Sequence, residues 1–232
     1  MSQNIDLRRS RLTTPRAAAI AGILFSVLLI TSLTMIRLSI PADPREAGQW
    51  LAGDKRPVEL ALNLLPFAGI AFLWFMGVIR DRLGEYEDQL FATVFLGSGL
   101  LFLAMLFVSA SLAGGVVITY GTSPTALDNA EAYGFARAAT YVILNTYAIK
   151  MAGVFMISTC TLFLRTKVTP RWMALLGYAL ALLLLVSISR TGWAFLVFPL
   201  WILLISIYIL VENYRRGPGM AATAFVKQED AG

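Results

Sequence analysis

Six long apolar runs fill most of this chain, and each is long enough to cross a lipid bilayer as a helix. The runs cover residues 17–40, 58–79, 91–118, 138–164, 172–189 and 193–211. The hydrocarbon core of a bilayer is about 30 Å thick, so about 20 helical residues span it. Only 14% of the 232 residues are charged, which leaves little material for a separate soluble domain. The sequence therefore predicts an all-α, polytopic membrane protein with one six-helix transmembrane domain over 17–212.

The lysines and arginines predict the orientation of these helices. If the basic tail 1–16 lies inside, the inner segments carry about twice as many of them as the outer segments, as the positive-inside rule requires. The inner set is Arg8, Arg9, Arg11, Arg16, Arg80, Arg82, Arg165, Lys167, Arg171, Arg215 and Arg216, and the outer set is Arg45, Lys55, Arg56, Arg137 and Arg190, with Arg37 near the boundary. Six crossings then place the tail 213–232 in the cytoplasm too, and the membrane is the plasma membrane. Because topology accounts for the positive charge, we expect no nucleic-acid partner.

Two predicted helix starts share one pattern. Thr14-Pro15-Arg16 and Thr169-Pro170-Arg171 each place a capping hydroxyl before a proline at the first helical position. The similarity continues, since Gly22 corresponds to Gly177 in the aligned runs. Either the first and last pairs of helices are duplicated hairpins, or leucine-rich helices with the same start signal simply look alike.

A helical pattern resumes at about residue 126 and runs into the fourth apolar run. A continuous helix from there to Leu164 is much longer than the bilayer is thick. We therefore expect its first turns either to project outside or to lie along the surface before a bend at Gly134.

Lys150 is a charged side chain inside the fourth apolar run. It lies about 22 Å from the inner boundary at Arg165, at about 1.5 Å per residue, and Asn145 makes the same stretch polar. Glu59 is its natural counter-ion at the outer end of the second run, one turn above Asn63. These residues predict an outward-facing polar cavity with a Lys150–Glu59 gate or anion site. The alternatives are a structural ion pair, or a lysine that extends to the outer interface.

The segment between the second and third runs reads Gly77-Val-Ile-Arg80-Asp81-Arg82-Leu-Gly84-Glu85. We expect a tight cytoplasmic turn here, with a charge network of Arg80, Asp81 and Arg82. The segment resembles the G-x-x-x-D-R-x-G signature of the major facilitator superfamily, which lies in the same inner loop. The resemblance implies a charge network at a helix end. However, Glu85 and Tyr86 stand where that family carries basic residues, and six spans are half of a typical facilitator.

Three further segments resemble uncharacterised multi-pass membrane proteins of bacteria. They are residues 74–81 (Trp-Phe-Met-Gly-Val-Ile-Arg-Asp), residues 91–99 (Phe-Ala-Thr-Val-Phe-Leu-Gly-Ser-Gly) and residues 169–177 (Thr-Pro-Arg-Trp-Met-Ala-Leu-Leu-Gly). This resemblance implies the six-span architecture and carries no activity.

The chain has no histidine and a single cysteine, Cys160, which we interpret as a small buried apolar side chain. The absence of histidine excludes rhomboid-like proteases, phosphohistidine-forming phosphatases, bis-histidine haem and histidine-rich zinc sites. One cysteine excludes disulfide chemistry that needs a pair within the chain. Carboxylates cluster in loops, at span boundaries and in the tails, so no paired-carboxylate site is evident within the bilayer. We therefore expect no enzyme activity, no cofactor and no metal.

Small residues in the third run favour close helix packing, and we expect this run to lie at the centre of the bundle. They are Gly97, Gly99, Ala104, Ser109, Ala110, Ala113 and Gly114. Two functions fit the sequence. The first is an accessory or structural subunit that binds lipid and another membrane protein or a second copy of itself. The alternative is a small transporter or permeation module around Lys150.

Overall fold

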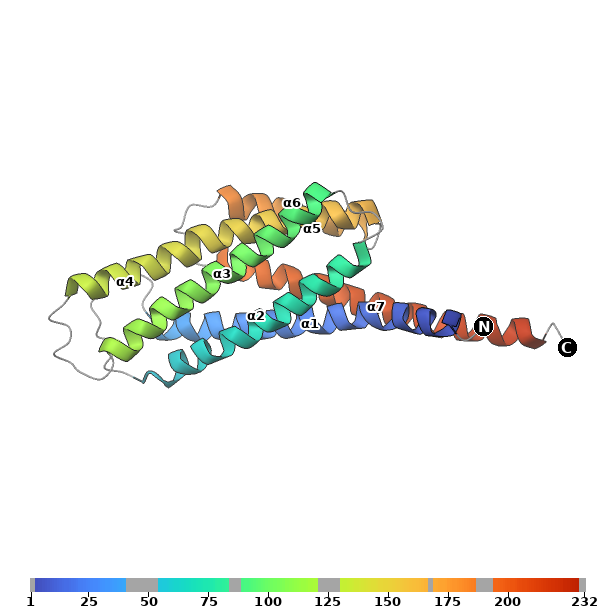
Figure 1. Cartoon of the computed structure of the whole chain (residues 1–232), viewed down its shortest axis with the longest axis horizontal. Helices are drawn as coiled ribbons and strands as arrows, with labels where there is room; N and C mark the ends of the chain where they lie inside the picture. The colour runs from blue at the N-terminus through green and yellow to red at the C-terminus, as the bar shows by residue number, and fades with distance from the viewer. Residues whose placement is uncertain are drawn as a thin grey trace.

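The computed structural model describes residues 3–40, 54–83, 89–120, 130–166, 169–186 and 194–229, and all of its regular structure there is helical (Figure 1). The helices are α1 (Gln3–Ser39), α2 (Arg56–Leu83), α3 (Gln89–Tyr120), α4 (Ala130–Val142), the π-helix η3 (Ile143–Ala148), α5 (Ile149–Thr166), α6 (Arg171–Val186) and α7 (Ala194–Glu229). The all-α prediction is confirmed for these residues.

Five helical segments are long and apolar enough to cross a membrane. They are Arg16–Ser39, Arg56–Arg80, Ala92–Thr119, Glu131–Arg165 and Ala194–Arg215. The run predicted over 172–189 forms the shorter apolar helix α6, which begins at Arg171 and ends at Val186. Residues 187–189 lie outside the described part of the chain.

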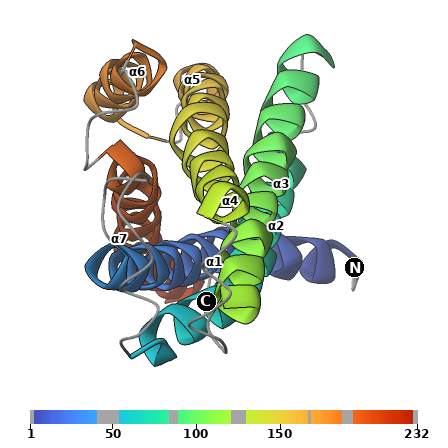
Figure 2. The ribbon, with the colours of Figure 1, turned by 90° about the vertical axis from the view of Figure 1, so that its left-hand side faces the viewer.

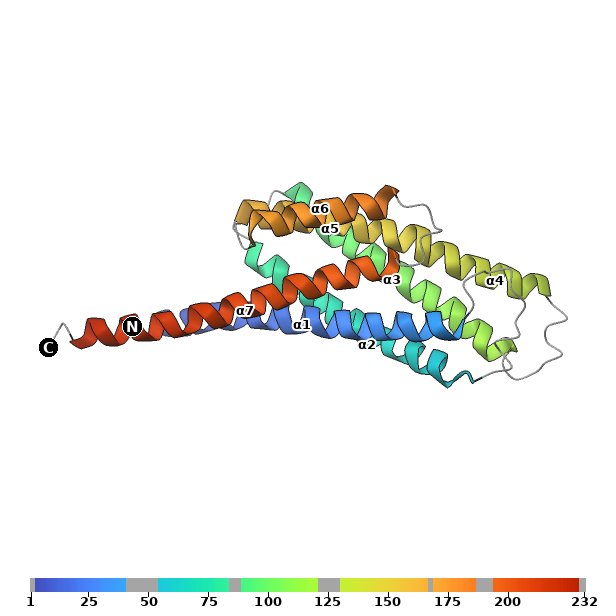
Figure 3. The ribbon, with the colours of Figure 1, turned by 180° about the vertical axis from the view of Figure 1, so that it is seen from behind.

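The helices pack in two groups. In the first, α1 packs along both α2 and α7; in the second, α5 packs on α3 and α6. Figure 2 shows α5 and α6 stacked over α1 and α7. The start of α1 and the end of α7 lie at the same end of the molecule and extend beyond the bundle (Figures 1 and 3). We call this the terminal end and the opposite one the distal end.

Only one of the two predicted helix starts is correct. α6 begins at Arg171, directly after Pro170, and the Met173 N–H donates to the Pro170 carbonyl oxygen at 3.1 Å. Thr14-Pro15-Arg16, in contrast, lies inside α1, which already begins at Gln3. The start signal marks a favourable place for a helix to begin, but leucine and arginine upstream are good helix formers, and nothing there stops the helix.

The long helix predicted before the fourth run is confirmed from Ala130, where α4, η3 and α5 follow one another without a break. Its apolar stretch of 35 residues is about 52 Å long at about 1.5 Å per residue. α4, which contains Gly134, continues the line of α5 without a sharp bend (Figure 3). Together with the end of α3, it extends past α1 and α2 at the distal end (Figures 1 and 3).

Phenylalanines from five helices meet at the centre of the bundle. Phe25 of α1 lies 4.7 Å from Phe72 of α2, measured between ring centres, and Phe102 of α3 lies 4.7 Å from Phe198 of α7. Phe155 of α5 joins them at 5.2 Å from Phe72. We call Phe25, Phe72, Phe102, Phe155 and Phe198 the phenylalanine cluster. Because lipid removes the hydrophobic drive between helices, van der Waals contact of this kind holds them together.

The prediction that the third run is central is wrong. The apolar window of α3 is 33% buried, whereas that of the continuous helix through α5 is 61% buried. The glycines explain the difference, because a Cβ at Gly97 or Gly115 would meet nothing within 4 Å. Gly99 does pack, against Met76 and Phe155. Small residues therefore allow another helix to approach α3 closely, but a neighbouring helix does not pack against every face that carries them.

The corresponding glycines of the two similar runs both mark close contacts with α7. A Cβ at Gly22 would meet Ser206 and Phe75, and one at Gly177 would meet Cys160 and Trp201. The two hairpins are nevertheless packed differently, because α1 lies along α2, whereas α6 lies mainly on α5.

Candidate functional site

Lys150 links α5 to the end of α6. Its half-buried ammonium group donates a hydrogen bond to the Leu185 carbonyl oxygen at 2.8 Å. Leu185 is in the last turn of α6, where backbone carbonyls have no partner within the helix and the helix dipole is negative. A lysine at this position donates a hydrogen bond to an unpartnered carbonyl and places a positive charge near the negative end of the helix dipole. It also joins two helices that are adjacent in sequence.

The structure does not bring Glu59 and Asn63 to Lys150. Both side chains are exposed on α2, and among the described residues Glu59 and Lys150 form no ion pair. The reason is the packing of α2 along α1, which turns the face carrying Glu59, Asn63 and Pro66 to the outside of the bundle. Glu59 and Asn63 therefore share a face of α2, as their spacing predicts, but that face lies away from the interior.

Asn145 lies within the π-helix, and its side chain forms a hydrogen bond with the backbone one turn earlier. Its amide nitrogen donates to the Tyr141 carbonyl oxygen at 3.0 Å. One turn earlier, Thr140 donates to the Ala136 carbonyl oxygen at 2.8 Å, while the Thr140 carbonyl accepts a bond from Ser109 at 3.1 Å. Since a π-helix disturbs the regular i to i−4 ladder, these side chains supply hydrogen bonds to the backbone around it.

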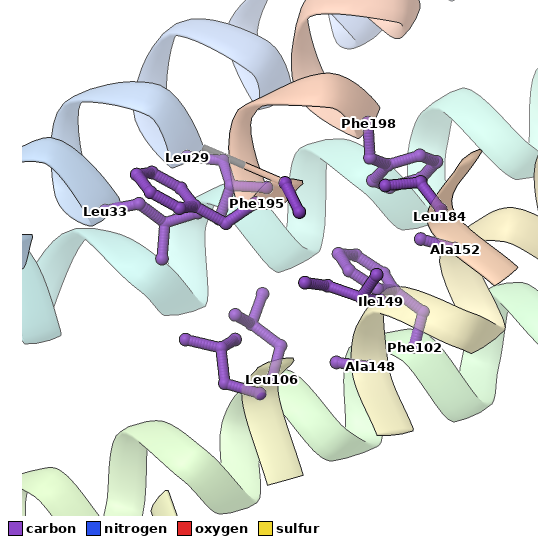
Figure 4. A pocket seen from close by; sticks show the side chains of 12 residues that line it. Leu29, Leu33, Phe102, Leu106, Ala148, Ile149, Ala152, Leu184, Phe195 and Phe198 are labelled. Carbon is purple, nitrogen blue, oxygen red and sulfur yellow. The ribbon is translucent and has the colours of Figure 1, made fainter. Parts of the chain in front are cut away.

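An apolar cavity of about 20 Å³ lies between the two groups of helices (Figure 4). Ile149 and Leu184 line it, and they are the chain neighbours of Lys150 and Leu185. A cavity of this size has room for about one water molecule, but a water needs polar partners and these walls are apolar. The other lining residues are Leu29, Leu33, Phe102, Leu106, Leu144, Ala148, Ala152, Ala194, Phe195 and Phe198. None of the four predicted site residues lines it.

The segment with Arg80, Asp81 and Arg82 is helical rather than a tight turn, because α2 continues to Leu83. The Arg80 side chain is exposed and has no hydrogen-bond or ion-pair partner among the described residues. The side chains of Asp81 and Arg82 lie outside the described part of the chain, as do residues 84–88. The charge network therefore stays a prediction.

Sequence reasoning missed Arg137, which it assigned to the outer segments. Arg137 is only 9% exposed, and its Nη1 donates to the Tyr133 hydroxyl at 3.1 Å. The guanidinium carbon lies 5.9 Å from the centre of the Tyr133 ring, and Tyr133 packs on Val116 of α3. A tyrosine and an arginine four residues apart share a helix face, so their spacing was the available signal.

Cys160 is fully buried where α5, α6 and α7 meet, as expected for a small apolar side chain. It faces Gly177 together with the Trp201 indole, whose buried N–H has no hydrogen-bond partner among the described residues. The missing side chain at Gly177 makes room for both.

Among the described residues, no group of three or more histidine, cysteine, aspartate or glutamate residues could hold a metal ion. Comparison of the chain with protein-family models, with curated proteins and with solved structures gave no match.

Proposed function

We propose that this protein is a non-catalytic integral membrane protein of the plasma membrane, an accessory or structural subunit that binds other membrane components. In this proposal six helices cross the bilayer and both ends of the chain are cytoplasmic. The placement of the start of α1 and the end of α7 at one end supports an even number of crossings (Figure 3). α6 is about 24 Å long over its 16 helical residues, so it spans with local bilayer thinning or with help from the residues that follow.

The phenylalanine cluster is the observation that carries this proposal. Rings from α1, α2, α3, α5 and α7 occupy the centre of the bundle, where a permeation path would have to run. The neighbouring cavity is apolar and has room for about one water molecule. Polar groups that could replace the hydration of an ion or solute are not among the residues that line it.

The outward face of α3 is the surface that fits a partner helix best. Gly97, Ala104 and Ser111 are spaced seven residues apart, and Ala104 and Ser111 are exposed. A Cβ at Gly97 would meet nothing within 4 Å, so the backbone is open to close approach. In lipid, helices associate through small residues of this kind.

Native mass spectrometry of the protein, extracted gently from its own membrane, tests the proposal. We expect a stoichiometric complex with a protein partner, and the variant Ala104→Leu should weaken it. Ala179→Leu is the matched control, because Ala179 is an exposed alanine on α6. A lone monomer in the native extract, or equal loss with both variants, would contradict the proposal.

A second function, a small transporter, draws support from the π-helix directly before Lys150 and beside the cavity. π-Helices in longer helices are frequent at functional sites. If Lys150 belongs to a pathway, Lys150→Met should abolish transport of a solute that the wild type carries. Unchanged transport with lower stability would exclude Lys150 from any such mechanism.

A further inference from the structure

The helices α1, α2 and α7 converge at Gly22, and this contact fixes their relative heights. A Cβ at Gly22 would meet both the Ser206 hydroxyl and the Phe75 ring. From that level toward the terminal end, at about 1.5 Å per residue, Arg16 lies about 9 Å away along α1 and Arg80 about 8 Å along α2. Tyr214 and Arg215 lie about 12 and 13 Å away along α7. Three helices thus bring three arginines and a tyrosine to within about one helical turn of one another in height.

Arg16 and Tyr214 confirm this register, because they are in contact. The Arg16 guanidinium carbon lies 5.2 Å from the centre of the Tyr214 ring. Both side chains are exposed, and so is Arg215. Neither Arg80 nor Arg215 has a hydrogen-bond or ion-pair partner among the described residues.

Among the described residues, the surroundings of Arg16, Tyr214 and Arg215 leave the positive charge in excess. Glu212 is half-buried one turn back on α7, and it has an interaction partner of its own within the molecule. Toward the bundle centre, exposed apolar side chains follow on the same helices, Ile20 and Leu24 on α1 and Ile207 and Val211 on α7. Cations with an exposed tyrosine therefore stand at the edge of an apolar belt, which is where lipid headgroups meet acyl chains.

We propose that Arg16, Tyr214 and Arg215 bind the phosphate-bearing headgroup of an anionic phospholipid. A guanidinium group donates two parallel hydrogen bonds to phosphate oxygens, and a tyrosine is stable at the headgroup level. The exposed apolar side chains toward the bundle centre on α1 and α7 contact the acyl chains. This lipid site goes beyond the accessory role proposed above and does not depend on it.

The full-length protein in nanodiscs with equal amounts of phosphatidylglycerol and phosphatidylcholine provides the test, with retained lipids counted by native mass spectrometry. We expect the wild type to retain phosphatidylglycerol preferentially. Each arginine near an anionic surface strengthens binding roughly fivefold, so Arg16→Gln should weaken retention about fivefold and the double variant with Arg215→Gln about thirtyfold. Arg16→Lys keeps the charge and should lose less than Arg16→Gln.

Two matched variants separate a defined site from general surface charge. Arg56→Gln removes an exposed arginine at the distal end, and Arg171→Gln removes one at the start of α6 in the other group of helices. Both should retain phosphatidylglycerol like the wild type. Equal loss in either variant, or no lipid preference in the wild type, overturns the proposal. Soluble glycerol phosphate that competes as well as the lipid would also overturn it, because the ligand would then be a free phosphate ester.

Discussion

Lys150 stabilises the bundle through a carbonyl oxygen rather than through a carboxylate. Replacing it by methionine keeps the apolar stem but leaves the Leu185 carbonyl without its donor. We expect the free energy of unfolding to fall by about 1–2 kcal/mol, the range for a hydrogen bond from a charged donor that is only half-buried. Thermal unfolding in detergent measures this. Glu59→Gln is the decisive comparison: it should have little effect, and equal destabilisation would mean that the two residues are paired after all.

Gly177 of α6 lies against Cys160 of α5 and Trp201 of α7, so three helices meet at this residue. In Gly177→Ala the new Cβ would lie 2.7 Å from the Trp201 indole nitrogen, so a helix must shift. Overpacking of this kind costs about 1–3 kcal/mol. Gly97→Ala is the same substitution where a Cβ meets nothing within 4 Å, and helix propensity should there make it neutral or stabilising by up to about 1 kcal/mol. Equal changes in melting temperature would contradict this packing.

At the residue scale, the sequence predicted individual positions better than their partners. The interior position of Lys150 and the burial of Cys160 followed from the apolar runs around them. Helical spacing also placed Glu59 and Asn63 on one face, but spacing within a helix does not say which helix that face meets. The partner of Lys150 is a backbone carbonyl, and no residue type marks such a group in a sequence.

In the continuous helix through α4, η3 and α5, the local stability of α4 should depend on its contacts with α3. Within α4, Arg137 donates a hydrogen bond to Tyr133, and Tyr133 packs on Val116 of α3. We expect Arg137→Met to lower the protection of α4 amides against hydrogen exchange by about tenfold or more, because a buried hydrogen bond to a charged group contributes about 1.5–3 kcal/mol. Amides of α5 should keep their protection. Unchanged exchange in α4 would mean that the arginine does not hold it.

At the element scale, apolar run length predicted the segments that can cross a membrane, and it did less well at helix ends. Five of the six runs form helices of sufficient length, while the remaining run corresponds to the shorter helix α6, which the structure describes as far as Val186. α1 is longer than predicted because polar residues before Pro15 continue the helix, and hydropathy carries no signal for that. The π-helix was not predicted either: Asn145 and Thr146 are weaker helix formers, but helix propensity does not distinguish a π-helix from an α-helix.

At the scale of the whole molecule, the arrangement of the helices could not be predicted from composition. Small residues predicted that α3 would be central, yet α3 is the least buried of the five long apolar segments. Phenylalanines, which the sequence scatters over the runs, instead form the contact among five helices. In lipid every helix is apolar on all sides, so hydropathy does not distinguish a face that packs on protein from one that packs on lipid.

Phe72 is one of the residues that join the two groups of helices, since it contacts aromatic rings of both. It lies 4.7 Å from Phe25 in its own group, and 5.5 Å from Phe102 and 5.2 Å from Phe155 in the other, between ring centres. Phe72→Ala should therefore lower the free energy of unfolding by about 3–5 kcal/mol, the usual cost of an emptied aromatic position in a core. Phe67→Ala makes the same change on the same helix at a side chain that is 61% exposed, and should cost far less. Denaturant titration, monitored by tryptophan fluorescence, distinguishes the two variants. Similar losses of stability in both would show that lipid, rather than the phenylalanine cluster, holds the two groups together.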